Sequence, residues 1–122
     1  MAKKKKQEKK NYAPTILNRK ARFEYRFIEV YDAGIVLTGT EIKSIRLSKV
    51  TISEGYCYFK DEELFIKDMH VNPYEFGNIN NMDPRRERKL LLSKRELQKL
   101  KAKSEEKGLT IIPAKLYFNA RN

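Results

Sequence analysis

Residues 35–46 decide how the chain folds: Ile35-Val36-Leu37-Thr38-Gly39-Thr40-Glu41-Ile42-Lys43-Ser44-Ile45-Arg46. The first four residues are apolar or β-branched and predict a strand, whereas Ile42 and Ile45 have the three-residue spacing of one helical face. Between the two halves, Gly39 interrupts the strand, and the Thr40 hydroxyl can accept a backbone N–H as the N-cap of a helix. We therefore predict a strand that passes directly into a short helix, which plugs a small β fold.

The composition is that of a small basic protein. The 122 residues suffice for one domain with a hydrophobic core, and 27 Lys and Arg against 16 Asp and Glu give a net charge of +11. This excess indicates an anionic partner, which is either nucleic acid or a membrane surface. A single cysteine allows no internal disulfide, and no stretch resembles a membrane span or a signal peptide, so we expect a cytoplasmic protein.

Two segments are expected along the chain, a basic tail over residues 1–14 and a β domain over residues 15–122. The tail has six lysines and little to bury, so it should be disordered. It either lies along RNA phosphates or is merely a solvated tail. In residues 23–31, aromatic and charged residues alternate, with a change of phase between Phe27 and Ile28. This pattern predicts a strand with a bulge or a sharp bend.

The remaining elements follow from hydrophobic alternation and from turn and capping residues. They are a hairpin of residues 56–59 and 64–66 that continues toward residue 71, a loop over 72–83, a strand over 89–92, a surface helix over 94–107 and a strand over 109–118 interrupted by Pro113. The helix has the clearest bounds, because Ser93 and Glu96 form a capping box and Gly108 can end it in a left-handed conformation. Its apolar face is thin, with Leu97, Leu100 and at most Ala102.

These elements predict a mainly β protein, an OB-fold-like small antiparallel Greek-key barrel with a short plug helix and one or two peripheral helices. In the strand over 89–92, period two places Leu90 and Leu92 on one face and Leu91 on the other. If the first pair lies in the core, Leu91 lies outside it. There it either packs beneath a neighbouring helix or offers an apolar contact to a partner.

Residues suited to catalysis or to metal binding are scarce. His70 is the only histidine, Cys57 lies in an aromatic run typical of a core, and no glycine-rich nucleotide motif is present. We therefore expect no enzyme activity, no cofactor and no metal site. Three basic clusters, in the tail and in residues 18–22 and 85–89, flank predicted strands, and exposed aromatic rings between them can stack on unpaired bases. This arrangement predicts RNA binding.

Several short segments are specific enough to compare with known families: Asn18-Arg19-Lys20-Ala21-Arg22, Asp32-Ala33-Gly34-Ile35-Val36-Leu37, Gly39-Thr40-Glu41-Ile42-Lys43-Ser44-Ile45-Arg46, Asp83-Pro84, Arg88-Lys89-Leu90-Leu91-Leu92, Lys94-Arg95-Glu96, Glu106-Lys107-Gly108 and Lys115-Leu116-Tyr117-Phe118. In order and spacing they closely resemble SmpB, the tmRNA-binding (SsrA-binding) family of bacterial trans-translation. The resemblance runs from about Asn18 to the last residues.

The resemblance implies an OB-like barrel and a non-enzymatic adaptor of the bacterial cytoplasm. Such an adaptor grips the tRNA-like domain of tmRNA near its elbow and, with elongation factor Tu, delivers it to ribosomes stalled on messages without a stop codon. We expect a monomer with no membrane partner. The family's RNA-contact positions that match here are Asn18, Asp32 and Leu91. On physical grounds we add Lys20, Arg22, Glu41, Lys43, Arg46 and Lys89.

Two of these candidate residues are acidic, and each has an alternative role. Asp32 can accept hydrogen bonds from base amino or imino groups, or it can cap its own turn. Glu41 can serve the RNA, in which case Glu41→Ala leaves the thermal melt nearly unchanged, or it can be a structural anchor, in which case the melt falls.

Two departures from the family pattern affect these expectations. Family members usually carry glutamate at the position of Asp32. They also continue past Tyr117-Phe118 with a further barrel strand and a long basic tail, which this sequence lacks. Either the protein has been cut at this point or the sequence given is only its ordered part. If it has been cut, we expect an exposed sheet edge, and some tmRNA affinity without support of tagging. The alternative function is that of a structural ribosomal protein or another OB-fold RNA-binding protein.

Overall fold

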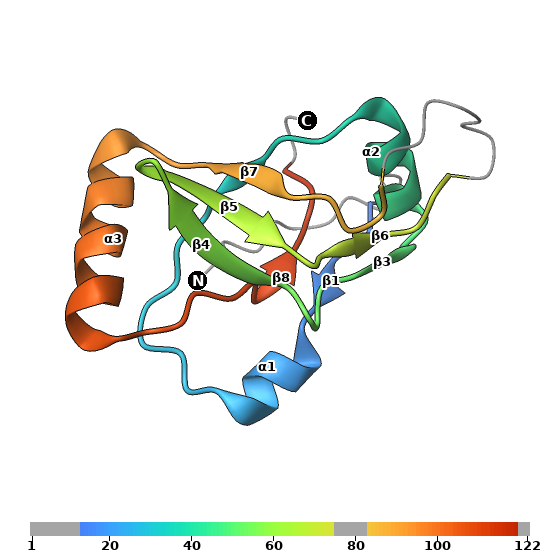
Figure 1. Ribbon diagram of the computed structural model, residues 1–122. Coiled ribbons are helices and arrows are strands. Elements are labelled where there is room, and N and C mark those ends of the chain that lie inside the picture. The colour runs from blue at the N-terminus through green and yellow to red at the C-terminus, as the bar shows by residue number, and fades with distance from the viewer. Residues whose placement is uncertain (1–12, 75–82, 120–122) are drawn as a thin grey trace.

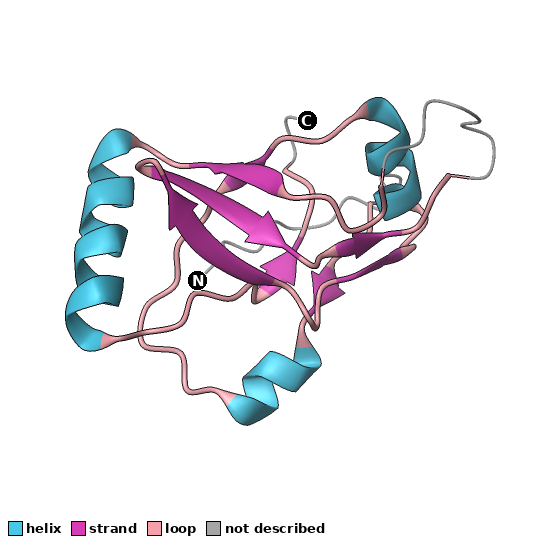
Figure 2. Cartoon of the chain, in the orientation of Figure 1, coloured by secondary structure: helices cyan, strands magenta, loops and turns pink. Residues whose placement is uncertain are grey.

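The computed structural model describes residues 13–74 and 83–119 and shows three helices among short antiparallel strands (Figure 1 and Figure 2). In chain order the elements are β1 (Ile16–Leu17), α1 (Arg19–Glu24), β2 (Gly34–Ile35), α2 (Gly39–Arg46), β3 (Val50–Thr51), β4 (Tyr56–Lys60), β5 (Glu63–Lys67), β6 (His70–Val71), β7 (Arg88–Leu91), α3 (Lys94–Lys107) and β8 (Lys115–Leu116). No helix among these residues is long and apolar enough to cross a membrane.

The strands form one four-stranded sheet, in the order β2-β7-β5-β4, and two small sheets, β1-β8 and β3-β6. The predicted mainly β, antiparallel class is confirmed, but the described strands do not close into a barrel. An apolar cavity of about 410 Å³ remains between the four-stranded sheet, α3 and the loop of residues 25–33.

The predicted hairpin is confirmed as β4 and β5, with Tyr58 opposite Phe65 in the register. Asp61 and Glu62 both have positive φ, 51° and 68°, as a two-residue type I′ turn requires. The second arm is shorter than predicted, because β5 ends at Lys67 and Asp68, with φ 61°, turns the chain toward β6. Residues 75–82 of the predicted loop over 72–83, and residues 1–12 of the predicted tail, lie outside the described residues.

The predicted strand over residues 23–31 is wrong. Residues 19–24 form α1, because the Asn18 side chain accepts the Ala21 N–H and caps a helix whose buried residue is Ala21. Residues 25–33 form a loop, and Phe23, counted in the alternating pattern, is 92% exposed. Local capping therefore outweighed the alternation of aromatic and charged residues.

Two other predicted strands are shorter in the structure. The strand before the plug helix is reduced to β2, and the last one to β8 with a single bridge between Ile111 and Cys57. Pro113, which has no N–H to donate, lies between that bridge and β8.

The predicted plug helix is α2, which begins two residues earlier than expected. Its N-cap is Thr38 and not Thr40: the Thr38 hydroxyl accepts the Glu41 N–H, and the Glu41 carboxylate accepts the Thr38 N–H. Ile45, 2% exposed, anchors α2 in the core. The buried residues of that core are Ile45, Val50, Ile52, Ile66, Met69 and Val71.

The predicted surface helix is confirmed as α3, with the capping box of Ser93 and Glu96 and with Gly108 at φ 61°. None of its residues is buried, and it lies at the edge of the molecule (Figure 1). Leu97 and Leu100 are half-buried, whereas Ala102 is exposed, so Ala102 does not belong to its apolar face.

Candidate RNA-binding surface

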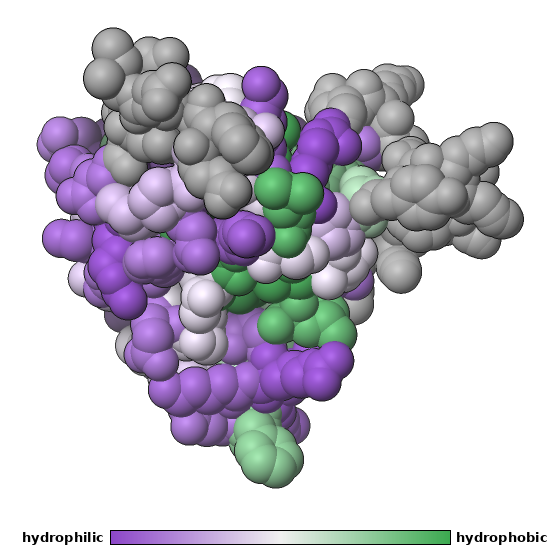
Figure 3. All heavy atoms as spheres, turned by 90° about the vertical axis from the view of Figure 1, so that its right-hand side faces the viewer, coloured by the Kyte–Doolittle hydropathy of each residue, from purple (hydrophilic) through white to green (hydrophobic). Residues whose placement is uncertain are grey.

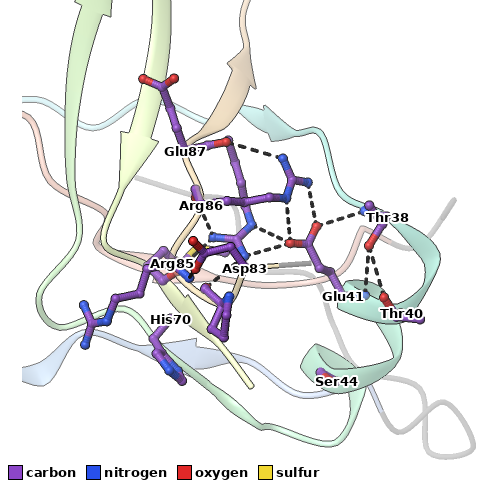
Figure 4. A network of polar contacts seen from close by, with 12 residues as sticks. Thr38, Thr40, Glu41, Ser44, His70, Asp83, Arg85, Arg86 and Glu87 are labelled. Atoms are coloured by element: carbon purple, nitrogen blue, oxygen red, sulfur yellow. Dashed lines mark hydrogen bonds and ion pairs between the residues drawn. The ribbon is translucent and has the colours of Figure 1, made fainter. Parts of the chain in front are cut away.

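A buried carboxylate joins α2 to the segment that leads into β7. The Glu41 side chain is 5% exposed and forms ion pairs with both Arg86 and Arg88. Figure 4 shows the contact between Glu41 and Arg86. Its Oε2 accepts from Arg86 Nε at 2.9 Å and from Arg88 Nε and Nη2 at 3.0 and 2.7 Å. Its Oε1 accepts from Arg86 Nη2 at 2.7 Å and from the Thr38 N–H at 2.9 Å. Both oxygens are therefore engaged within the protein.

Arg88 is the most deeply placed member of this cluster, with 1% of its surface exposed. Besides Glu41, its guanidinium donates to the backbone carbonyls of Met69 at 2.8 Å, Arg86 at 3.0 Å and Pro84 at 3.0 Å. These contacts use all five N–H groups that an arginine can donate. The burial of this charge is thus matched by a complete set of partners, which ties together three separate parts of the chain.

The pKa of Glu41 reflects two opposing influences. Burial favours the neutral acid and raises the pKa, but hydrogen bonds from Arg86, Arg88 and the Thr38 N–H outweigh it and lower the pKa to about 2. Glu41 is therefore ionised at any pH near neutrality. Of the two roles considered for Glu41, the geometry favours the structural anchor.

Asn18, another candidate contact residue, is also buried, with 2% of its surface exposed. Its Oδ1 accepts the Ala21 N–H, and its Nδ2 donates to the carbonyl of Pro113 at 2.8 Å and more weakly to that of Ile52 at 3.4 Å. The side chain both starts α1 and fixes that helix to the segment before β8. Its polar groups are directed into the protein, so it positions the cations of α1.

Four of the candidate cations are exposed on the two short helices. On α1, Lys20 forms an ion pair with Glu54 at 3.0 Å, and Arg22 lies in the last turn. On α2, the Lys43 ammonium lies 5.6 Å from the centre of the Tyr74 ring, and the Arg46 guanidinium lies 4.6 Å from that of Phe118. At the α2 end of the molecule, hydrophilic side chains surround a central apolar area (Figure 3).

The Asp32 turn lies next to the segment that contains β8. The Tyr117 hydroxyl donates to Asp32 Oδ1 at 3.3 Å, and burial together with the nearby carboxylate raises the pKa of Tyr117. Tyr117 thus contacts the Asp32 turn while the adjacent Phe118 contacts Arg46. Sequence reasoning missed both aromatic contacts, which connect candidate residues far apart in the chain.

Lys89 and Leu91 lie on the outer face of β7. Leu90 packs against the core and Leu91 is 49% exposed, which confirms that Leu91 lies outside the core. Gly34 lies opposite Leu91, and a Cβ atom at Gly34 would be 3.5 Å from that of Leu91. The Lys89 ammonium pairs with Glu63 at 3.0 Å across the sheet.

The structure therefore separates the candidates into two kinds. Asn18 and Glu41 are buried and hold elements together. The other candidates lie on the surface, on α1, α2, β7 and the turn before β2: Lys20, Arg22, Asp32, Lys43, Arg46, Lys89 and Leu91. Sequence reasoning also missed that Arg88, counted in a basic cluster, is buried. The signal was available, because Arg88 shares the parity of the core residue Leu90.

Groups with catalytic potential are few in the described part of the chain. No group of three or more His, Cys, Asp or Glu residues there could hold a metal ion. Burial raises the pKa of the Cys57 thiol to about 12, which leaves it protonated and unreactive near neutral pH. His70 Nδ1 lies 3.1 Å from Asn72 Oδ1 at the end of β6.

Known proteins of one family match this chain along most of its length. The family model described as SmpB protein matches residues 15–122. An SsrA-binding protein of Thermus thermophilus is 50% identical over 109 residues, which are 89% of this chain and 76% of that protein. One of Cytophaga hutchinsonii is 58% identical over 106 residues, 87% of this chain and 69% of that protein.

A solved structure is similar to this chain in fold as well as in sequence. It is described as "tmRNA-SmpB: a journey to the center of the bacterial ribosome" and superposes with a TM-score of 0.74 at 50% identity. The matched part is 89% of this chain and 76% of that chain.

Proposed function

Because the chain belongs to the SmpB family, we propose that it binds tmRNA and brings it to stalled ribosomes, where incomplete proteins are tagged and the ribosome is released. The observation that carries this proposal is the match of the SmpB family model to residues 15–122, which include α1, α2, β7 and α3. The 50% identity to an SsrA-binding protein over 109 residues agrees with it. The likeness in fold to a chain described with tmRNA and the ribosome supports the same partners.

The exposed cations supply the part of the affinity for RNA that does not depend on the nucleotide sequence of the RNA. Lys20, Arg22, Lys43 and Arg46 reach the solvent from two helices that the buried residues hold in place. Each phosphate that such a side chain neutralises should add roughly −0.7 to −0.9 to the slope of log K against log salt. These contacts orient the RNA but cannot distinguish tmRNA from other RNA.

Recognition of a particular RNA needs contacts of another kind, and Asp32 and Leu91 are suited to them. A carboxylate repels phosphate but accepts hydrogen bonds from base amino and imino groups, and an exposed leucine packs on base or sugar surfaces. Both lie near the start of β2, since Gly34 is opposite Leu91. We therefore place specific recognition at this turn and the cations of α1 and α2 around it.

We also propose that the chain acts in the bacterial cytoplasm as a monomeric adaptor without catalytic activity or a membrane partner, together with elongation factor Tu during delivery. The lysines of residues 1–14 lie along RNA phosphates, as the charge of that segment favours.

A competition experiment separates this function from that of a structural ribosomal protein. The chain is mixed with labelled tmRNA at physiological ionic strength, and unlabelled tmRNA or ribosomal RNA fragments compete in a filter-binding assay. The proposal predicts that tmRNA competes at least about tenfold better than ribosomal RNA of equal length, because Asp32 and Leu91 add contacts that charge alone does not provide. Equal competition by both RNAs contradicts it.

A further inference from the structure

The four-stranded sheet has an outer face that does not pack against the hydrophobic core. In the register, Cys57 lies opposite Ile66 and Leu64 opposite Leu90, and these side chains face the core. Residues of the other parity face outward, so that Tyr58 lies opposite Phe65 and Phe65 opposite Lys89. The outer face therefore carries a row that crosses β4, β5 and β7.

Three neighbouring aromatic rings, those of Tyr56, Tyr58 and Phe65, lie on the β4 and β5 part of this face. The centres of the Tyr56 and Tyr58 rings are 6.0 Å apart and those of Tyr58 and Phe65 are 6.3 Å apart, with interplanar angles of 36° and 32°. Tyr56 is 41% exposed, and the other two rings are half-buried. Rings in such a row offer flat apolar surfaces of the kind on which unpaired bases stack.

Lysines border the rings on the same face. The Lys60 ammonium lies 5.1 Å from the centre of the Phe65 ring, Lys67 lies opposite Tyr56, and Lys89 lies opposite Phe65. Lys60 and Lys89 pair with Glu87 and Glu63 at 3.1 and 3.0 Å, but both pairs are at the surface. Exposed pairs contribute little free energy, so phosphates can replace these carboxylates at small cost.

The row is also continuous with the surface assigned above to tmRNA, because Lys89 and Leu91 belong to the same outer face of β7. We propose that the outer face of β4 and β5 binds unpaired nucleotides of tmRNA, with bases on Tyr56, Tyr58 and Phe65 and phosphates on Lys60 and Lys67. This inference rests on the proposed function and extends it by a second contact. Base-paired RNA does not fit this face, because its bases are stacked on one another and only its phosphates are offered.

The test uses the double variant Tyr56→Leu/Tyr58→Leu, which removes two rings and leaves the charge and most of the apolar volume. Its matched control is Tyr25→Leu, since Tyr25 is a 48% exposed tyrosine of the loop after α1. The probes are tmRNA, a 12-nucleotide oligouridylate and a 12-base-pair RNA duplex, measured at one salt concentration. Circular dichroism verifies that each variant is folded, and Tyr56→Leu alone serves if the double variant is not.

We expect the double variant to bind the oligouridylate at least about tenfold more weakly, since stacking of a base on even one of the two lost rings provides that order of affinity. Affinity for tmRNA should also fall, with loss of protection at unpaired nucleotides only, while affinity for the duplex and all affinities of Tyr25→Leu stay unchanged. Unchanged binding of tmRNA and the oligouridylate, or an equal loss for oligouridylate and duplex, overturns this inference. Failure of wild-type chain to prefer tmRNA over ribosomal RNA overturns the proposed function instead.

Discussion

Replacement of Glu41 by alanine is expected to lower the free energy of unfolding by about 3–5 kcal/mol, the usual cost of removing one partner from a buried ion pair. The variant leaves Arg88, 1% exposed, as a buried cation without its carboxylate, and it also removes the acceptor of Arg86 and of the Thr38 N–H. Urea unfolding followed by circular dichroism measures the change.

The matched control for this substitution is Glu63→Ala, which removes an acid that pairs with Lys89 at the surface, with 48% of its side chain exposed. That change should cost at most about 1 kcal/mol. A second variant, Glu41→Leu combined with Arg88→Met, should be more stable than Glu41→Leu alone, because it removes the unpaired charge as well. If Glu41→Ala unfolds like wild type but binds tmRNA more weakly, Glu41 is an RNA contact and the anchor assignment is wrong.

Acid should destabilise the wild-type protein more than it destabilises Glu41→Gln. The pKa of Glu41 is lowered from 4.5 to about 2 in the folded protein. Its carboxylate therefore contributes its full stabilisation above the unfolded-state pKa, and this contribution is lost as the pH falls toward 2. A difference of this size in pKa corresponds to about 3 kcal/mol in the free energy of unfolding.

The measurement compares urea unfolding of the two proteins between pH 7 and pH 2.5. Other carboxylates, such as Glu29, whose pKa is lowered by hydrogen bonds from Lys103 and Tyr31, are present in both proteins, so their effects cancel in the difference. The free energies of unfolding of the wild type and of Glu41→Gln should converge as the pH falls. Parallel curves for the two proteins would show that Glu41 does not titrate as this cluster requires.

The parts of the fold that the sequence predicts well depend on signals contained within a few residues. The capping box of Ser93 and Glu96 and the left-handed Gly108 give both ends of α3, and alternation on either side of a four-residue turn region gives β4 and β5. Where two local signals compete, the prediction fails. In residues 19–24 the Asn18 cap and the buried Ala21 favour a helix, although the aromatic pattern that follows is typical of a strand.

The candidate site was harder to predict, because a polar residue type does not reveal whether its side chain faces solvent or another part of the chain. Glu41 meets partners 45 and 47 positions away, and Asn18 meets the carbonyl of Pro113 95 positions away. Neither contact leaves a local pattern. The parity of Arg88 with Leu90 could have indicated a buried arginine, and such an arginine implies a buried acid. The RNA contacts of the exposed residues remain predictions.

A footprint of tmRNA with and without the protein shows whether the chain recognises the tRNA-like domain. Nuclease or hydroxyl-radical cleavage of end-labelled tmRNA is compared with the free RNA and with a lysine-rich peptide of equal charge, +11. We expect protection to be concentrated in the tRNA-like domain. Leu91→Ala should weaken this protection and Leu47→Ala should leave it unchanged, since both leucines are exposed but only Leu91 adjoins Gly34 and Lys89. Protection scattered over the whole RNA, as with the peptide, would contradict recognition of the tRNA-like domain.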